Sequence, residues 1–76
     1  MEQGSLEQSL SETIRASLRS NGRTQAELAL ALGVGQPRIS DRLNGRVKWS
    51  AVEVQHVADF LDVPVSTLLR TALADA

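Results

Sequence analysis

The chain has no cysteine and no tyrosine, and it has only one histidine, one tryptophan and one phenylalanine. Without cysteine it has no disulfide bonds and no thiolate zinc sites, and His56 does not form a metal site by itself. No apolar run is long enough to cross a membrane, and residues 1–5 lack the layout of a signal peptide. The 76 residues therefore predict one cytoplasmic domain with a small aliphatic core, and we expect no metal, cofactor or small-molecule ligand.

Positive charge is concentrated in the middle of the chain, although the net charge is only −1. Residues 15–48 contain seven basic and two acidic residues, a local net charge of +5, whereas residues 1–14 and 49–76 each carry −3. A surface that faces DNA phosphates requires such a concentration of positive charge. Because charge asymmetry alone is only suggestive, a solvated basic stretch without a partner is the alternative interpretation.

Apolar residues recur at helical spacing and period-two alternation is absent, which predicts an all-α fold of five helices. We expect the first helix over about residues 6–20, with Leu6, Leu10, Ile14 and Leu18 in one inward stripe. The other four helices are expected from Thr24 to Gly33, from Gly35 to Asn44, over about 50–61 and over about 65–73, and residues 74–76 are expected to fray.

Residues 24–45 have the spacing of a helix-turn-helix unit, in which a tight glycine turn joins two short helices. Thr24 and Glu27 match a capping box at the start of the first of these helices. Gly33 supplies the positive φ that the turn requires. Gly35 precedes the second helix and is a weak N-cap, because serine or threonine in that place caps more strongly.

The segment after this unit contains the only tryptophan of the chain, Trp49, followed by a second capping box at Ser50 and Glu53. A tryptophan on such a loop either covers the small core or stacks on a nucleic acid, and we favour the first interpretation. Phe60 is expected in the core or at an interface, and His56 is expected on the surface.

Landmark residues at fixed offsets from 24 to 69 match the pattern of a known family. The landmarks are Thr24, Gln25, Glu27, Leu28, Ala29, Leu32, Gly33, Val34, Gln36, Ile39, Ser40, Leu43, Asn44, Gly45, the run 61–65, Leu68 and Leu69. They resemble the Cro/CI-type, or Xre, family of helix-turn-helix transcriptional regulators of phages and bacteria. The resemblance implies a lambda-repressor-like fold in which residues 1–76 form a single DNA-binding domain. The sequence departs from the family pattern at Gly35, Pro37, Arg42 and Asp62.

The resemblance implies that the N-terminal residues of the third helix enter the major groove of DNA and contact bases. Those residues are Gln36, Pro37, Arg38 and Asp41. A glutamine pairs with adenine N6 and N7, an arginine pairs with guanine O6 and N7, and a proline offers an apolar contact to a thymine methyl group. Asp41 either accepts a hydrogen bond from cytosine N4 or pairs with Arg38 and orients it. In the alternative interpretation, Gln36 and Arg38 contact phosphates only.

Phosphate contacts are expected around the same helix, where they set affinity and register without reading sequence. Gln25 matches the glutamine that holds a DNA phosphate in the family. The other expected phosphate contacts are Arg42, Asn44, Arg46 and Lys48, with Arg15, Arg19 and Arg23 as secondary candidates. In the alternative interpretation these residues are solvated, and Arg42 occupies a position that is often apolar in the family.

The resemblance predicts a cytoplasmic protein of a bacterial host cell that binds double-stranded operator DNA and regulates transcription, as a Cro-like or immunity repressor of a phage or prophage does. We expect a homodimer, formed either in solution or only on DNA, through the fifth helix with Val65, Leu69 and Leu73. The alternative is a protein-interaction module, the antitoxin of a toxin–antitoxin pair. No arrangement of catalytic residues is evident, so we expect no enzyme activity.

Overall fold

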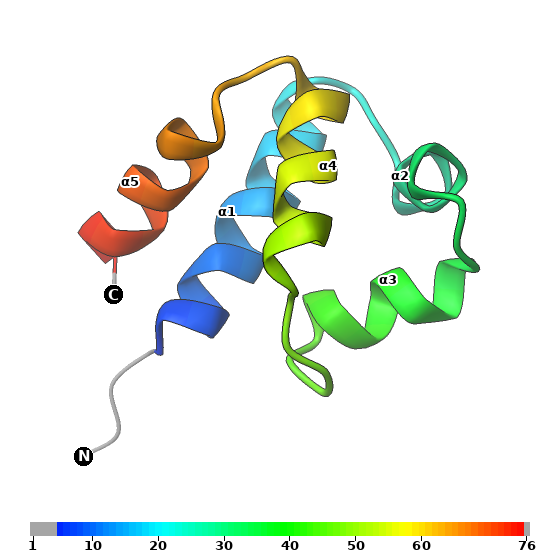
Figure 1. The fold of residues 1–76 in the computed structure, drawn as a ribbon, viewed down its shortest axis with the longest axis horizontal. Coiled ribbons are helices and arrows are strands. Elements are labelled where there is room, and N and C mark those ends of the chain that lie inside the picture. The colour runs from blue at the N-terminus through cyan, green and yellow to red at the C-terminus, as the bar shows by residue number, and fades with distance from the viewer. Residues whose placement is uncertain (1–4, 76) are drawn as a thin grey trace.

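The computed structural model describes residues 5–75, which form five α-helices and no strand (Figure 1). The helices are α1 (Leu6–Ser20), α2 (Gln25–Leu32), α3 (Gln36–Leu43), α4 (Ala51–Leu61) and α5 (Val65–Asp75). The predicted all-α fold of five helices is therefore confirmed. The predicted fraying of Ala74 and Asp75 is wrong, because α5 continues to Asp75. The predictions for residues 1–4 and for Ala76 fall outside the described range.

α1, α2 and α4 each begin directly after a residue whose side chain caps the helix. Ser5 Oγ accepts a hydrogen bond from the Gln8 N–H at 3.0 Å, and both predicted capping boxes have their two reciprocal bonds. Gly33 ends α2 with φ 72°, the left-handed conformation that the turn requires. Asp62 ends α4 in the same conformation, with φ 59°, which aspartate tolerates better than most residues. This explains how the chain accommodates an aspartate where its family commonly has glycine.

The core is aliphatic and receives side chains from all five helices. Ile14, Leu28, Ile39 and Val57 are fully buried, and they come from α1, α2, α3 and α4 respectively. Leu68 and Ala72 bury the inner face of α5. The predicted stripe of α1 is wrong at Leu6, which is exposed because it is the first residue of the helix and lies beyond the core.

The central pair of helices, α1 and α4, has different neighbours on its two sides. α5 packs mainly on α1, whereas α2 and α3 pack on each other and on the opposite side of the α1–α4 pair (Figure 1). The helix-turn-helix unit and α5 therefore lie on opposite sides of the molecule. Within residues 5–75, no helix combines the length and the apolar character needed to cross a membrane.

Candidate nucleic-acid interface

The N-terminal turn of α3 projects from the molecule and is exposed. Gln36, Pro37 and Arg38 are all exposed, and the Arg38 side chain keeps 58% of its surface accessible. Gln25, at the start of α2, lines a shallow hollow together with Gln36, Pro37 and Ser40. The structure thus brings a predicted phosphate contact beside two predicted base contacts, on one surface formed by the starts of α2 and α3.

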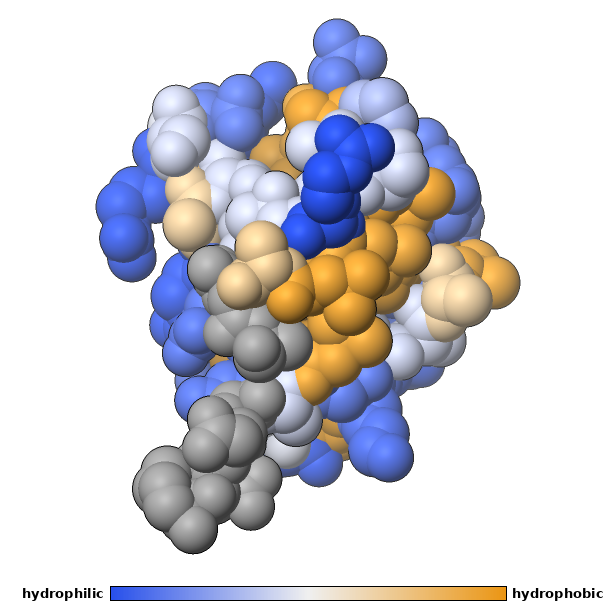
Figure 2. Space-filling model, turned by 90° about the vertical axis from the view of Figure 1, so that its left-hand side faces the viewer, coloured by the Kyte–Doolittle hydropathy of each residue, from blue (hydrophilic) through white to orange (hydrophobic). Residues whose placement is uncertain are grey.

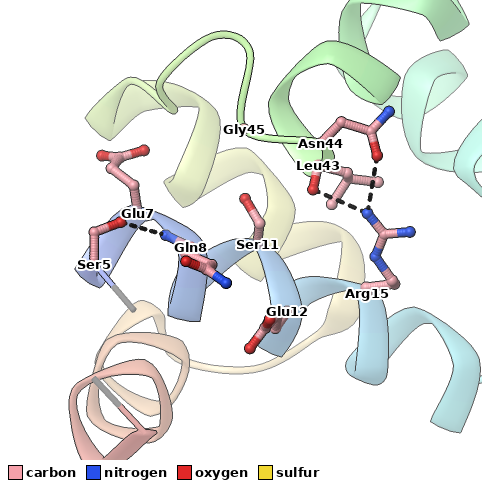
Figure 3. Close-up of a pocket in the computed structure, with 9 residues that line it drawn as sticks. All are labelled: Ser5, Glu7, Gln8, Ser11, Glu12, Arg15, Leu43, Asn44 and Gly45. Atoms are coloured by element: carbon pink, nitrogen blue, oxygen red, sulfur yellow. Dashed lines mark hydrogen bonds between the residues drawn. The ribbon is translucent and has the colours of Figure 1, made fainter. Parts of the chain in front are cut away.

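The C-terminal end of α3 is held by α1, which the sequence did not indicate. Arg15 Nη2 donates to the Leu43 carbonyl oxygen at 2.9 Å and lies 3.4 Å from Asn44 Oδ1 (Figure 3). Ser11 Oγ donates to the Arg42 carbonyl oxygen at 2.9 Å. The Arg15 bond gives the Leu43 carbonyl oxygen a partner at a helix end, where carbonyls lack intrahelical partners, and the Arg15 charge complements the negative end of the helix dipole. The Arg42 carbonyl oxygen also accepts a hydrogen bond from the Gly45 N–H at 3.2 Å. α3 is therefore anchored at its C-terminal end, while its N-terminal turn projects.

Trp49 covers the core, as predicted from the sequence. Its side chain is 7% exposed, and its Nε1–H donates to Ser11 Oγ at 3.0 Å. Its backbone N–H donates to Glu7 Oε1 at 3.2 Å. Because Ser11 also bonds to the Arg42 carbonyl oxygen, the tryptophan is linked through one hydroxyl to the end of α3. It is too deeply buried to stack on a nucleic acid.

Arg42 points to α4 and not to solvent, so we withdraw the expected phosphate contact of this residue. Its Nε lies 2.8 Å from both carboxylate oxygens of Glu53, and the two side chains are only 11% and 15% exposed. Moving the guanidinium to solvent would leave the partly buried Glu53 carboxylate without its ion-pair partner, which costs free energy. Arg42 occupies a position that is often apolar in the family, and here it forms an ion pair with Glu53. The sequence did not indicate this pair, because the two residues lie on different helices.

Hydrogen bonds lower the pKa of the Glu53 carboxyl below its ordinary value. Burial by itself raises this pKa, but hydrogen bonds from Arg42 and Ser50 and the Arg42 charge together outweigh burial. A lowered pKa stabilises the folded state above the ordinary glutamate pKa, about 4.3, and this contribution is lost as the pH falls below it.

We therefore expect Glu53→Gln to be less stable than the wild type at neutral pH, and we expect the difference to shrink as the pH falls below about 4.3 and the wild-type carboxyl becomes protonated. Urea unfolding followed by circular dichroism over a pH series measures this difference. A difference that stays constant down to acid pH would contradict the ionic role of Glu53.

Asp41 pairs with Arg46 and not with Arg38, which corrects one of the two expectations for this residue. The Asp41 Oδ1 to Arg46 Nη1 distance is 3.2 Å, and both side chains are largely exposed, so the pair is weak and easily exchanged. Asn44 Nδ2 donates to Ser40 Oγ at 3.2 Å. Lys48 is exposed on the loop that follows.

Arg23 and Phe60, two further residues singled out in the sequence, lie against each other. The Arg23 guanidinium lies 5.4 Å from the centre of the Phe60 ring, which is partly buried against the core. His56 is exposed, as predicted. Residues 5–75 contain no cluster of three or more side chains suited to hold a metal ion.

The comparisons with known proteins agree with this geometry. A protein-family model described as helix-turn-helix, of the Xre/Cro/CI type, matches residues 14–68, which is more than half of the chain. No curated protein matches the chain. The family is one of DNA-binding domains, and its fold is the all-α lambda-repressor-like helix-turn-helix fold. This chain therefore belongs to the Xre/Cro/CI-type helix-turn-helix family and is a DNA-binding domain.

Proposed function

We propose that residues 1–76 act as one sequence-specific repressor, of the Cro-like or immunity-repressor kind found in phages and prophages, which covers operator DNA. The observation that carries this proposal is the exposed N-terminal turn of α3, which projects from a helix anchored at its other end. A rigidly held helix with a free N-terminal turn is suited to the major groove. In this proposal Gln36, Pro37, Arg38 and Asp41 contact bases.

The phosphate contacts that we propose lie at both ends of α3. Gln25 lies beside the start of α3, and Asn44, Arg46 and Lys48 follow its end. One N–H of the Asn44 amide bonds to Ser40, and its second N–H has no partner among the described residues. The exposed pair of Arg46 with Asp41 exchanges readily for a phosphate, because surface ion pairs are weak. These four residues set the register of α3 on the duplex.

The test is fluorescence anisotropy of the full chain with labelled DNA from the intergenic region upstream of its own gene, over a series of salt concentrations. We expect tight binding that scrambled competitor DNA does not remove, with an affinity that falls steeply as salt rises. Weak binding that scrambled DNA removes equally well would contradict the proposal. That result would point to a protein as the main partner, as in an antitoxin.

We further propose that two copies of the chain associate with each other through α5. The resulting dimer binds a pseudo-palindromic operator. Leu69 and Leu73 are 38% and 60% exposed on this helix, and Leu6 of α1 is exposed as well. Figure 2 views the molecule from the side of α5 and shows an apolar area there. This surface lies opposite the helix-turn-helix unit, so it remains accessible while α3 occupies the groove.

The double variant Leu69→Ser with Leu73→Ser is expected to bind a full operator at least about tenfold more weakly, because the apolar area of two leucines no longer becomes buried. Its affinity for an isolated half-site is expected to remain unchanged. Footprinting together with sedimentation measures both effects, and Leu30→Ser is the matched control because Leu30 is exposed on α2. A wild-type chain that stays monomeric and protects only one half-site would contradict the dimer.

A further inference from the structure

One carboxylate of α4, that of Glu53, lies near two arginines of α3, the helix that we propose enters the major groove. Glu53 accepts from the Ser50 N–H at 2.9 Å as part of the α4 capping box, and it pairs with Arg42 at 2.8 Å. The Arg38 Nε lies 3.9 Å from the same carboxylate. Arg38 and Arg42 are one helical turn apart and therefore share a face of α3. Glu53 thus lies beside the face of α3 that carries both arginines, closest to Arg42 in the last turn of that helix.

The two arginines are held to different degrees. Arg42 is held at two of its three nitrogens, because its Nε pairs with Glu53 and its Nη1 donates to the Arg38 carbonyl oxygen at 3.3 Å. Arg38 only approaches the carboxylate, and its side chain is 58% exposed against 11% for Arg42. Glu53 therefore holds the Arg42 guanidinium against α4, whereas the Arg38 guanidinium lies near the same carboxylate and remains largely exposed.

We infer that Glu53 is a specificity-determining residue that acts by positioning these two arginines. It keeps the Arg42 guanidinium away from DNA phosphates and orients the Arg38 guanidinium for contact with a base edge. Phosphate contacts increase affinity for every sequence, whereas base contacts increase it for one sequence. Removing one cation from the phosphate contacts while orienting the other for a base raises the ratio of specific to non-specific affinity. This inference rests on the proposed function.

Glu53→Gln tests the inference, since glutamine keeps the size of the side chain and removes its charge. We expect Arg42 to become available to a phosphate, so that the slope of log affinity against log salt becomes steeper by about 0.9 on scrambled DNA. At 0.1 M salt, one such contact corresponds to affinity for scrambled DNA about five- to tenfold higher. The preference for the native fragment over scrambled DNA is expected to fall. A merely destabilised protein would instead lose affinity for both DNAs in proportion.

Glu27→Gln is the matched control. Glu27 occupies the same capping-box position in α2 and carries the same charge, and its ion-pair partner is the exposed Arg23, not an arginine of α3. The control therefore reproduces the loss of a cap and of one negative charge. We expect the preference for the native fragment to remain at its wild-type value in this variant.

The double variant Glu53→Gln with Arg42→Met covers the case in which Glu53→Gln folds poorly, because it leaves no unpaired buried charge. We expect it to show the wild-type salt slope with a reduced preference for the native fragment.

Circular dichroism establishes that each variant is folded before binding is measured. If either the slope or the preference of folded Glu53→Gln equals that of the Glu27→Gln control, the inference is overturned. A wild type without any preference refutes the proposed function and with it the role of Glu53 in specificity, and in that case the salt slope decides only whether Glu53 keeps Arg42 away from phosphates.

Discussion

Trp49→Ala is expected to lower the free energy of unfolding by about 3–5 kcal/mol, the largest stability loss that we expect from a single substitution in this chain. The indole is 7% exposed and packs against the core, so its removal leaves a cavity. The change also removes the hydrogen bond that Trp49 donates to Ser11. For a domain of this size the total stability is about 4–11 kcal/mol, so much of it is lost.

Urea unfolding followed by far-ultraviolet circular dichroism measures the effect, because the variant has no tryptophan for fluorescence. Trp49→Phe helps to separate the two causes, since phenylalanine keeps much of the buried apolar surface but removes the Nε1–H donor together with one ring of the indole. We expect Trp49→Phe to cost about 1–2 kcal/mol. If the alanine variant costs no more than the phenylalanine variant, the packing of Trp49 contributes little and our description of it as a cover of the core is wrong.

Arg38→Ala is expected to produce the largest change in DNA recognition. Loss of a bidentate contact to guanine costs about 1–3 kcal/mol, which is about a 5- to 150-fold loss of affinity for the native site. The preference at a single base pair is expected to relax. Folding is expected to change little, because the Arg38 side chain is 58% exposed and its one ion-pair contact within residues 5–75 is the 3.9 Å approach to Glu53.

Anisotropy titrations against a set of operators, each with one altered base pair, measure this relaxation. Arg46→Ala is the matched control, because Arg46 is exposed and is a proposed phosphate contact. That variant is expected to weaken binding to all sequences equally and to make the salt slope shallower by about 0.9. If Arg38→Ala also weakens all sequences equally, Arg38 contacts a phosphate and does not read a base.

Local signals in the sequence predicted most of the fold. Capping boxes at Thr24 and Ser50 and the glycine at position 33 act within one turn of the chain, so their geometry follows from neighbouring residues. The periodicity of apolar residues predicted which faces of the helices are buried, and its failure at Leu6 is a failure at a helix end. The family pattern is also local in this sense, since it depends on fixed offsets along the chain.

The sequence by itself determined the five helices, the turn between α2 and α3, and which residues begin the projecting helix. Only the tertiary structure decided what each charged side chain does. Arg42 and Lys48 have the same charge and looked equivalent in the sequence, yet one is buried against Glu53 and the other is exposed. Arg15, a secondary phosphate candidate in the sequence, holds the end of α3 instead. Ion pairs and hydrogen bonds between helices depend on how those helices pack, and no spacing along the chain encodes that arrangement directly.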